Sequence, residues 1–334
     1  MVAKGTKAAT PKTASLLFNN LAANARHVAY VAYSSVVVAP EGPVLVGGSA
    51  TGGTTIEDPD GAQIQQARWV QLPAEELLCV ASQRSLQLYT PEAQQLLHIV
   101  NAKQSDGEGL ASFRGIASCE TGSAAYIVSG VSTGAICLVP LLGPQQFGDS
   151  LLRPASEHPI VDVTAGQAPH NDPSRALICT ADGVGDVHVH ALEEDGTWGH
   201  CTTFTASTTD GSASLCTALR MRGVRLFTAY STGHVRIFDL VSCTQCAQIS
   251  AHARWINALE VHPDGFRFAT ASEDTLIGLW GCAETGAVPQ ISNVAMIPAA
   301  DALLTGVAFG GGFDKTHLLA TAYDQAAIHA WRLD

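Results

Sequence analysis

One stretch, residues 249–280, constrains the fold of this chain more than any other part of it. It begins with an apolar alternation after His252, turns at Pro263–Gly265 (ProAspGly), and continues into two further short strands that end at Trp280. Alternation of period two predicts half-buried β-strands, and a Pro-Asp-Gly cluster predicts a tight turn between them. The stretch therefore predicts three short antiparallel strands joined by two hairpin turns.

The same hairpin pattern recurs along the chain. Six segments with apolar alternation on both sides of a small or polar turn end at residues 89, 139, 190, 238, 280 and 331, which are spaced by 42 to 51 residues. Such spacing is typical of propeller blades that carry loop inserts. Val28–Tyr33, Val36–Ala39 and Val44–Val46 predict the strands of one more blade. We expect an all-β fold, a single seven-bladed β-propeller; six or eight blades also fit, since the first repeat is poorly formed.

The two ends of the chain are expected to meet. The sequence stops three residues after Trp331, so the last blade lacks its outer strand, and a segment near Ser15–Asn19 is predicted to supply it. Closure of this kind removes exposed sheet edges. Residues 1–14 have the composition of a flexible basic tail, and residues 15–334 are predicted to form the propeller.

Polar residues of the 249–280 stretch predict a buried network. The Asp274 carboxylate can accept a hydrogen bond from His252, and Ser272 or Thr270 can link that imidazole to the Trp280 indole. This set resembles the His–Ser/Thr–Asp–Trp structural network of the WD-repeat family. The resemblance implies a fold signature, taken here as His252, Ser272, Asp274 and Trp280, without catalysis.

Within that family, several short segments are similar to the family of WD repeat-containing protein fifty-four. They are 19–21 (AsnAsnLeu), 68–69 (ArgTrp), 114–116 (ArgGlyIle), 251–254 (AlaHisAlaArg) and 273–275 (GluAspThr). The other blades depart from the WD-repeat pattern: Tyr89, Val139, His190 and Phe238 replace its Trp, and Thr133, Val184, Thr232 and Gln325 replace its turn Asp. Apolar packing is expected to hold those blades, and the polar network to be complete once.

Composition excludes some classes of function. The net charge of −12 argues against non-specific binding to nucleic acid or to anionic lipid. No apolar run approaches the ~18 residues of a membrane span. Nine scattered Cys indicate free thiols in a reducing compartment, so a cytoplasmic location is expected.

Motifs that could carry chemistry have structural explanations. Residues 130–134 match G-x-S-x-G, but a strand follows where a nucleophile elbow needs a helix. The lone CxxC at 243–246 lacks a second ligand pair for zinc. Asp186, His188 and His190 share one strand face, yet His190 in the Trp position with His158 one blade-length earlier indicates a core imidazole pair. We predict no catalytic residue, no metal and no cofactor.

The expected function is a non-enzymatic protein–protein interaction scaffold, a subunit of a cytosolic multiprotein complex of the ciliary or cytoskeletal kind. In the WD-repeat family one face is built from the loops before each innermost strand and from the central hairpin turns. On this chain the partner-binding residues predicted there are Arg84, Asp182, Tyr230, Arg254, Trp255, Glu273, Tyr323 and Asp324.

Two alternatives remain. A substrate receptor of a cullin-type ubiquitin ligase would carry TrpAspXaaArg at a blade end, where this chain has Trp280-Gly and Trp331-Arg-Leu. A propeller enzyme would gather carboxylates and His around a central metal; Asp162 lies on an expected innermost strand, but most other innermost strands offer Ala, Val, Gly and Ile.

Overall fold

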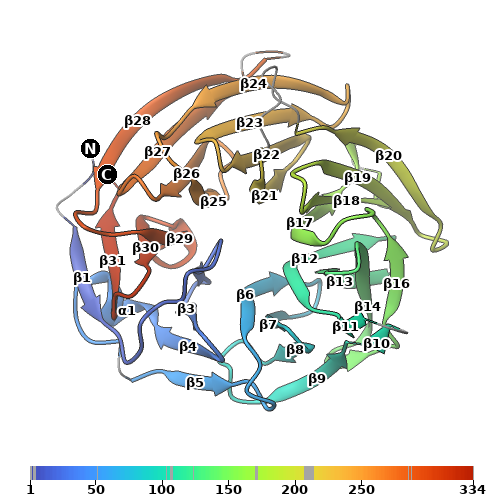
Figure 1. Ribbon diagram of the computed structural model, residues 1–334, viewed down its shortest axis with the longest axis horizontal. Coiled ribbons are helices and arrows are strands. Elements are labelled where there is room, and N and C mark those ends of the chain that lie inside the picture. Colours follow the sequence, from blue (N-terminus) through green and yellow to red (C-terminus); the bar gives the residue numbers. More distant parts are fainter. Residues whose placement is uncertain are drawn as a thin grey trace.

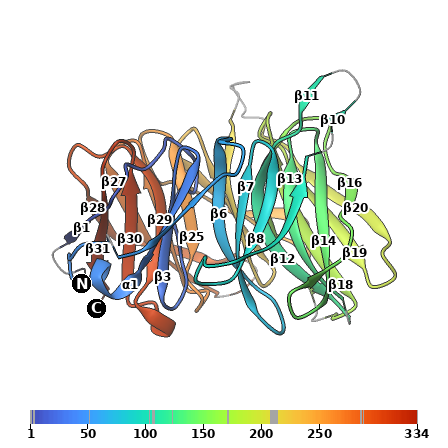
Figure 2. The ribbon, with the colours of Figure 1, turned by 90° about the horizontal axis from the view of Figure 1, so that it is seen from below.

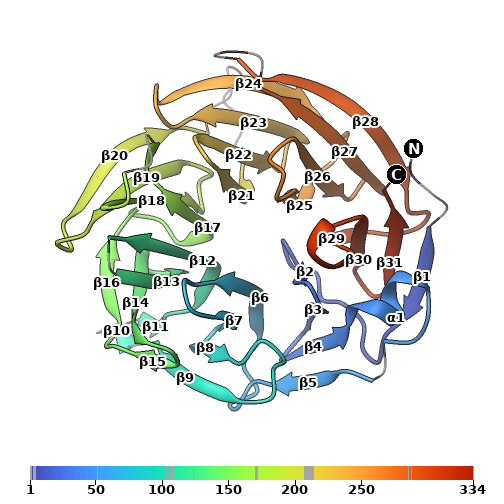
Figure 3. The ribbon, with the colours of Figure 1, turned by 180° about the vertical axis from the view of Figure 1, so that it is seen from behind.

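The computed structural model describes residues 2, 5–50, 52–102, 104–105, 108–122, 124–169, 172–206, 214–284, 286 and 288–333. Within these residues seven antiparallel sheets of four or five strands stand around a central channel (Figures 1 and 3), and a short hairpin, β10 (Gln104–Ser105) with β11 (Glu108–Leu110), forms one further sheet. The predicted seven-bladed β-propeller is confirmed.

The first three blades follow the chain from its blue end in Figure 1. Blade 1 contains β2 (Ala22–Ala23), β3 (His27–Ala32), β4 (Ser35–Pro40) and β5 (Thr54–Glu57). Blade 2 contains β6 (Ile64–Gln71), β7 (Glu76–Ser82), β8 (Ser85–Tyr89) and β9 (Leu96–Asn101). Blade 3 contains β12 (Phe113–Thr121), β13 (Ala124–Val131), β14 (Ala135–Gly143), β15 (Gln146–Phe147) and β16 (Leu151–Pro154).

The other four blades complete the ring. Blade 4 contains β17 (Ile160–Gln167), β18 (Arg175–Asp182), β19 (Val187–Glu193) and β20 (Trp198–Phe204). Blade 5 contains β21 (Cys216–Arg222), β22 (Arg225–Tyr230), β23 (His234–Asp239) and β24 (Thr244–Ser250). Blade 6 contains β25 (Ile256–Val261), β26 (Arg267–Ser272), β27 (Leu276–Ala283) and β28 (Gln290–Pro298). Blade 7 contains β29 (Leu304–Gly310), β30 (His317–Ala322), β31 (Ala327–Arg332) and β1 (Thr6–Ala9).

Burial explains why some strands are easy to recognise in the sequence. The second strand of a blade is covered on both faces by its neighbours, so β7 and β18 are nearly continuous apolar runs. The outer strand faces solvent, and β28 is largely exposed. The core lies between the blades in seven apolar clusters of described residues, such as the one that joins blades 5 and 6 through Phe227 and Phe268.

The ring closes between the two ends of the chain, but with a different segment from the one predicted. The strand that pairs with β31 is β1, with Thr6 opposite Ala330 and Ala9 opposite Ala327, whereas Ser15–Asn19 bonds to Val31 and Asn257 in other blades. The flexible tail predicted over residues 1–14 is therefore wrong for residues 6–9, since their backbone completes the blade 7 ladder. Residues 1, 3 and 4 lie outside the described part of the chain.

Blade 1 also differs from its prediction. The segment expected as a third strand at Val44–Val46 belongs instead to a short helix, α1 (Glu41–Leu45), and to the residue after it. The outer strand β5 (Thr54–Glu57) lies in a stretch whose Gly- and Asp-rich composition resembles a loop. The inner strand β2 has two residues, because the chain reaches it from the centre of the channel.

The disc has two faces, seen edge-on in Figure 2. We call upper the face with the turns between second and third strands and with the loops that lead into each inner strand, including β10 and β11. The lower face carries α1 and a 3-10 helix, η2 (Gly312–Asp314). No helix among the described residues is long and apolar enough to cross a membrane.

Candidate functional site: the latched upper face

The polar network of blade 6 ties the upper loop at His252 to the sheet below. The His252 Nδ1 lies 3.0 Å from Asp274 Oδ2, its Nε2 lies 2.8 Å from Thr270 Oγ1, and the Trp280 indole N–H donates to the same Oγ1 at 3.0 Å. Burial lowers the pKa of His252 despite the opposing charge of Asp274. The neutral ring then donates through Nδ1 to Asp274 and accepts the Thr270 hydroxyl proton at Nε2. The side chains of His252, Thr270 and Trp280 are thus hydrogen-bonded within the network.

Ser272 does not form the link between His252 and Trp280. Its hydroxyl accepts the Asp274 amide at 3.1 Å and so stabilises the hairpin turn. Thr270 takes the linking position because it pairs across the sheet with Gly278, and a Cβ on Gly278 would stand 2.4 Å from the Trp280 nitrogen. The choice of Ser272 for the network is wrong, and Thr270, the other candidate from the sequence, is correct.

Blade 4 contains a second buried network made of other residues, so the expectation that this blade relies on apolar packing is wrong. The Asp182 Oδ2 accepts the Ser156 hydroxyl at 2.7 Å and lies 2.8 Å from His188 Nε2, while its Oδ1 accepts the amides of Val184 and Asp186. Asp182 is 1% exposed and cannot contact a partner, which corrects its prediction as a binding residue.

The predicted imidazole pair of blade 4 is wrong as well. His158 is exposed. The residue equivalent to His252 is Ser156, since both backbone amides donate to the carbonyl of a turn glycine in the preceding blade. His190 is buried in the Trp position as expected, but its ring stacks on Trp198, with ring centroids 4.7 Å apart.

Blade 2 has a third such network, built on Asp58. The Gln87 amide donates to Asp58 Oδ2 at 2.9 Å, and the Tyr89 hydroxyl donates to Gln87 Oε1 at 2.7 Å. Tyr89 occupies the Trp position, and its hydroxyl donates to the network of blade 2 as the Trp280 indole N–H donates to that of blade 6. The Tyr89–Gln87 spacing was the signal in the sequence for this network.

Six of the eight predicted partner-binding residues are accessible on the upper face. The exceptions are Asp182 and Tyr230, whose side chain is fully buried beneath Arg236, with the guanidinium carbon 4.5 Å from the ring centroid. The prediction for Tyr230 fails because its hairpin position directs the ring inward, between blades. The accessible six are Arg84, Arg254, Trp255, Glu273, Tyr323 and Asp324.

A segment that the sequence analysis did not assign to the site crosses the upper face. Residues 10–21, the latch, lead from β1 on the rim to the channel and follow the turns of blades 7 and 1 (Figure 1). The Ala14 carbonyl accepts the Asp324 amide at 3.2 Å, and the Ser15 amide donates to the Val31 carbonyl at 3.0 Å. Lys12 forms an ion pair with Glu57 at 2.6 Å. The latch is therefore an ordered part of the face.

The inner end of the latch plugs the channel. Asn19 donates through Nδ2 to Asp162 Oδ2 at 3.2 Å, and the Asn20 side chain exchanges two hydrogen bonds with the backbone of Val31. Both asparagines are buried. Gly306 makes room for them, because a Cβ there would lie 2.6 Å from the backbone of Asn20. The AsnAsn pair at 19–20 was the available signal, since buried amides need partners on several strands.

Apolar side chains gather along the latch on the upper face. Leu16 is 55% exposed, Tyr33 65%, Tyr323 47% and Trp255 43%. Phe18 is half-buried, with its ring centroid 6.2 Å from that of Trp255 and the Arg114 guanidinium 5.1 Å from its centroid. We call Leu16, Phe18, Tyr33, Trp255 and Tyr323 the aromatic band. Exposed apolar side chains that cluster in this way mark interaction surfaces.

Below the plug, four charged side chains from four inner strands meet across the channel. Arg220 on β21 pairs with Asp162 on β17 at 3.1 Å and with Glu260 on β25 at 2.8 Å, and Arg68 on β6 pairs with Glu260 at 3.1 Å. Both carboxylates are thus engaged by guanidinium groups. Among the described residues no three His, Cys, Asp or Glu side chains are placed to hold a metal ion.

The two remaining motifs of the sequence, at 130–134 and 243–246, lie in strands and turns, where a structural role explains them. The GlyValSerThrGly segment at 130–134 spans the end of β13 and the turn into β14. Cys243 and Cys246 are at the turn and start of β24 and, like the other seven Cys, are free thiols. Burial raises the pKa of the Cys246 thiol, which lowers its reactivity.

Comparison with known proteins covers nearly the whole chain. The family model WDR54 matches residues 6–332. WD repeat-containing protein 54 of Mus musculus is 28% identical over 222 residues, which are 65% of this chain and 62% of that protein, so the match spans less than two thirds of this relative. WD repeat-containing protein 54 of Homo sapiens is 25% identical over 276 residues, 79% of this chain and 77% of the relative.

Solved structures with low identity share the fold. A chain in the crystal structure of the mitotic checkpoint complex superposes with a TM-score of 0.70 at 15% identity, covering 100% of this chain and 95% of that one. The WD40 β-propeller domain of Doa1 gives a TM-score of 0.66 at 12% identity, with coverage of 99% and 97%. The resemblance inferred from the short segments is confirmed: with its model matched from residue 6 to residue 332, the chain belongs to the WDR54 family.

Proposed function

We propose that this protein is a non-enzymatic scaffold that binds a protein or peptide partner through the aromatic band on its upper face. The WD-repeat propeller is in general a protein-interaction module, which supports the coarse assignment. The observation that carries the proposal is the aromatic band itself: five apolar side chains follow one ordered segment across the face. Aromatic residues anchor interfaces because they bury a large area at a low cost in side-chain entropy.

Charges around the band favour a partner with polar groups at its margin. Arg254 extends into solvent beside Trp255 and lies 3.8 Å from Glu273. Arg84 and Asp324 stand exposed on the turns of blades 2 and 7. An apolar centre with a polar rim is the usual anatomy of a protein–protein interface. The partner expected is therefore a segment with apolar anchors and flanking charges of both signs.

We extend the proposal to a cytosolic multiprotein complex, of the ciliary or cytoskeletal kind. The ciliary or cytoskeletal setting rests on the family, since such assemblies use many WD-repeat propellers. The low content of charged residues, 14%, supports membership in a complex.

Two matched double variants test the face. Arg254→Ala with Trp255→Ala removes a cation and an aromatic ring from the upper face. Phe266→Ala with Phe313→Ala removes two aromatic rings from the lower face, where Phe313 is 91% exposed. Partners are identified by proximity labelling in cells with the intact chain, and direct binding of each is then measured with purified proteins. We expect the upper-face variant to weaken binding by at least about tenfold, the loss of one or two anchor residues, and the lower-face variant to retain it.

Both variants must keep the melting temperature of the parent. Binding that is lost only in the lower-face variant would reverse the assignment of the face. Partners retained by both variants would refute the aromatic band as the contact.

A further inference from the structure

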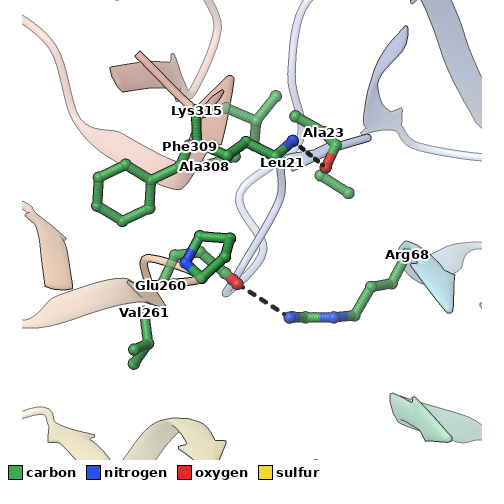
Figure 4. Close-up of a pocket in the computed structure, with 10 residues that line it drawn as sticks. Leu21, Ala23, Arg68, Glu260, Val261, Ala308, Phe309 and Lys315 are labelled. Carbon is green, nitrogen blue, oxygen red and sulfur yellow. Dashed lines mark hydrogen bonds and ion pairs between the residues drawn. The ribbon is translucent and has the colours of Figure 1, made fainter. Parts of the chain in front are cut away.

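The lower half of the channel is a blind cavity. It is lined by Leu21, Ala22 and Ala23, at the end of the latch and the start of blade 1, and by Arg68, Glu260 and Lys315 (Figure 4). The cavity measures about 140 Å³, whereas one water needs only ~10–15 Å³. A second cavity of about 260 Å³ shares Arg68 and Glu260 with the first. Since Asn19 and Asn20 fill the channel above, a ligand would enter from the lower face.

Positive charge exceeds negative charge on these walls. Arg68, Arg220, Arg222 and Lys315 line the two cavities, against one carboxylate, Glu260. Asp162 neutralises part of the excess through Arg220, which leaves a net positive lining in a chain whose net charge is −12. An anion is the ligand that such a lining attracts, and the low dielectric of an enclosed site strengthens the attraction.

Two of these cations have donors that the protein does not use. Among the described residues, the hydrogen bonding of Arg68 consists of one bond, from Nη2 to Glu260 Oε1 at 3.1 Å, although a guanidinium carries five N–H donors. Lys315 Nζ donates to the carbonyls of Asn24 at 2.9 Å and Ala23 at 3.5 Å, which leaves one of its three donors, and it has no carboxylate within ion-pair distance in the described part of the chain. Figure 4 shows both side chains at the same cavity. Burial lowers the pKa of each, which a bound anion would reverse.

We propose that the lower channel binds a small phosphate-bearing molecule, with its phosphate between Arg68 and Lys315 and its remaining atoms in the larger cavity beside Arg220 and Arg222. Guanidinium and ammonium groups together suit a phosphate, because the planar fork binds two oxygens while the ammonium acts as a point charge. The narrow cavity, with Asn19 and Asn20 filling the channel above it, favours a free small molecule over a phosphorylated side chain of a partner protein.

The purified full chain is titrated by calorimetry with pyrophosphate, inorganic phosphate and glucose 6-phosphate. Glucose, and sodium chloride at matched ionic strength, are the controls. We expect saturable binding of the phosphates and none of glucose. Arg68→Gln and Lys315→Met are each expected to weaken pyrophosphate binding by at least about tenfold, the effect of one charge-assisted contact. Arg84→Gln, on the upper face, is expected to bind as the parent does.

Lys315→Met keeps the experiment decisive if Arg68→Gln fails to fold, because Lys315 takes no part in the ion pairs across the channel. As a check on the parent protein, pyrophosphate is expected to protect Arg68 from phenylglyoxal. Absence of saturable binding, binding unchanged in both channel variants, or an equal loss in Arg84→Gln would overturn the proposal. A phosphopeptide that binds more tightly than any small phosphate would overturn the choice of ligand.

Discussion

Blades 6 and 4 place different residues in the same positions, and in each of them a carboxylate bonds the upper loop to the sheet. The equivalent pairs, set by backbone hydrogen bonds and strand register, are His252 and Ser156, Ser272 and Asp182, Gly278 and His188, and Trp280 and His190. In blade 6 the acid is on the turn at Asp274, and in blade 4 it has moved to the end of the second strand. What the two share is an acid bonded to the loop residue.

The networks of blades 6 and 4 differ in the exposure of their acids and in whether the ring at the Trp position can be protonated. The Asp274 side chain is 10% exposed and accepts from His252 and from the amides of Ala253 and Leu276. Asp182 is 1% exposed and accepts four hydrogen bonds. Blade 4 also replaces an indole, which does not titrate, with the imidazole of His190. We therefore expect blade 4 to be more sensitive to the loss of its acid and to low pH.

The largest effect is expected from Asp182→Ala. The change leaves two amides, a hydroxyl and an imidazole without their acceptor in a buried site, at a cost of about 3–4 kcal/mol in unfolding free energy. Asp274→Ala exposes its donors to water and is expected to cost about 2 kcal/mol. Urea denaturation of both variants measures the difference. An equal loss would show that burial does not distinguish the two networks.

Acid is expected to destabilise the protein through His190. Burial, with His200 and His188 nearby, lowers its pKa to about 4, so the unfolded chain binds a proton that the folded chain does not between about pH 6.5 and pH 4. Stability therefore falls as the pH falls through that window, by roughly 2–4 kcal/mol from this group. His190→Phe keeps a ring on Trp198 and removes the titration.

The measurement is the unfolding free energy from pH 7 to pH 4 for the parent, His190→Phe and His329→Phe. His329 stacks on Trp331 and has a pKa lowered to about 4 by burial, so each variant is expected to remove part of the slope. An unchanged slope in His190→Phe would show that blade 4 does not respond to acid through this imidazole.

Thr270→Val tests the centre of the blade 6 network. The variant keeps the shape of the side chain but removes the oxygen that accepts from Trp280 and donates to His252. Two buried partners lose their hydrogen bond, so we expect a loss of about 2 kcal/mol. Chemical denaturation followed by tryptophan fluorescence measures it, and a loss below ~0.5 kcal/mol would mean that water replaces the hydroxyl.

The blades that the sequence predicted well are those with buried second and third strands. There, side-chain burial imposes the pattern, as in β26 and β27 of blade 6. The closing strand β1 was missed because its TKAA sequence has one buried side chain, and backbone pairing with β31 leaves no mark on composition. Residues 54–57 were missed for the same reason, since an outer strand needs no apolar alternation.

The site was predicted less completely than the fold. Loop position predicted that Trp255 and Tyr323 are exposed on the upper face, but it could not tell that Asp182 and Tyr230 turn inward, because burial depends on the neighbouring blade. The latch escaped prediction since its contacts join segments far apart in sequence, such as Asn19 with Asp162. A hydrogen bond between an acid and a hydroxyl, such as that of Asp182 with Ser156, likewise cannot be predicted from the sequence before the strand register is known.

The smallest effect in this comparison is expected from Ser272→Ala. The hydroxyl supports the turn by accepting the Asp274 amide, and Asp182 Oδ1 plays the same part in blade 4 by accepting the Val184 amide. The variant removes the acceptor of one amide and a long hydrogen bond of 3.4 Å to the Arg254 carbonyl, so the cost should be about 0.5–1 kcal/mol, below that of Thr270→Val. Urea denaturation of the two variants side by side distinguishes the contribution of the turn to the unfolding free energy from that of the network. A loss in Ser272→Ala as large as that in Thr270→Val would mean that the turn carries the link from His252 to Trp280, and that blades 6 and 4 are more alike than their contacts indicate.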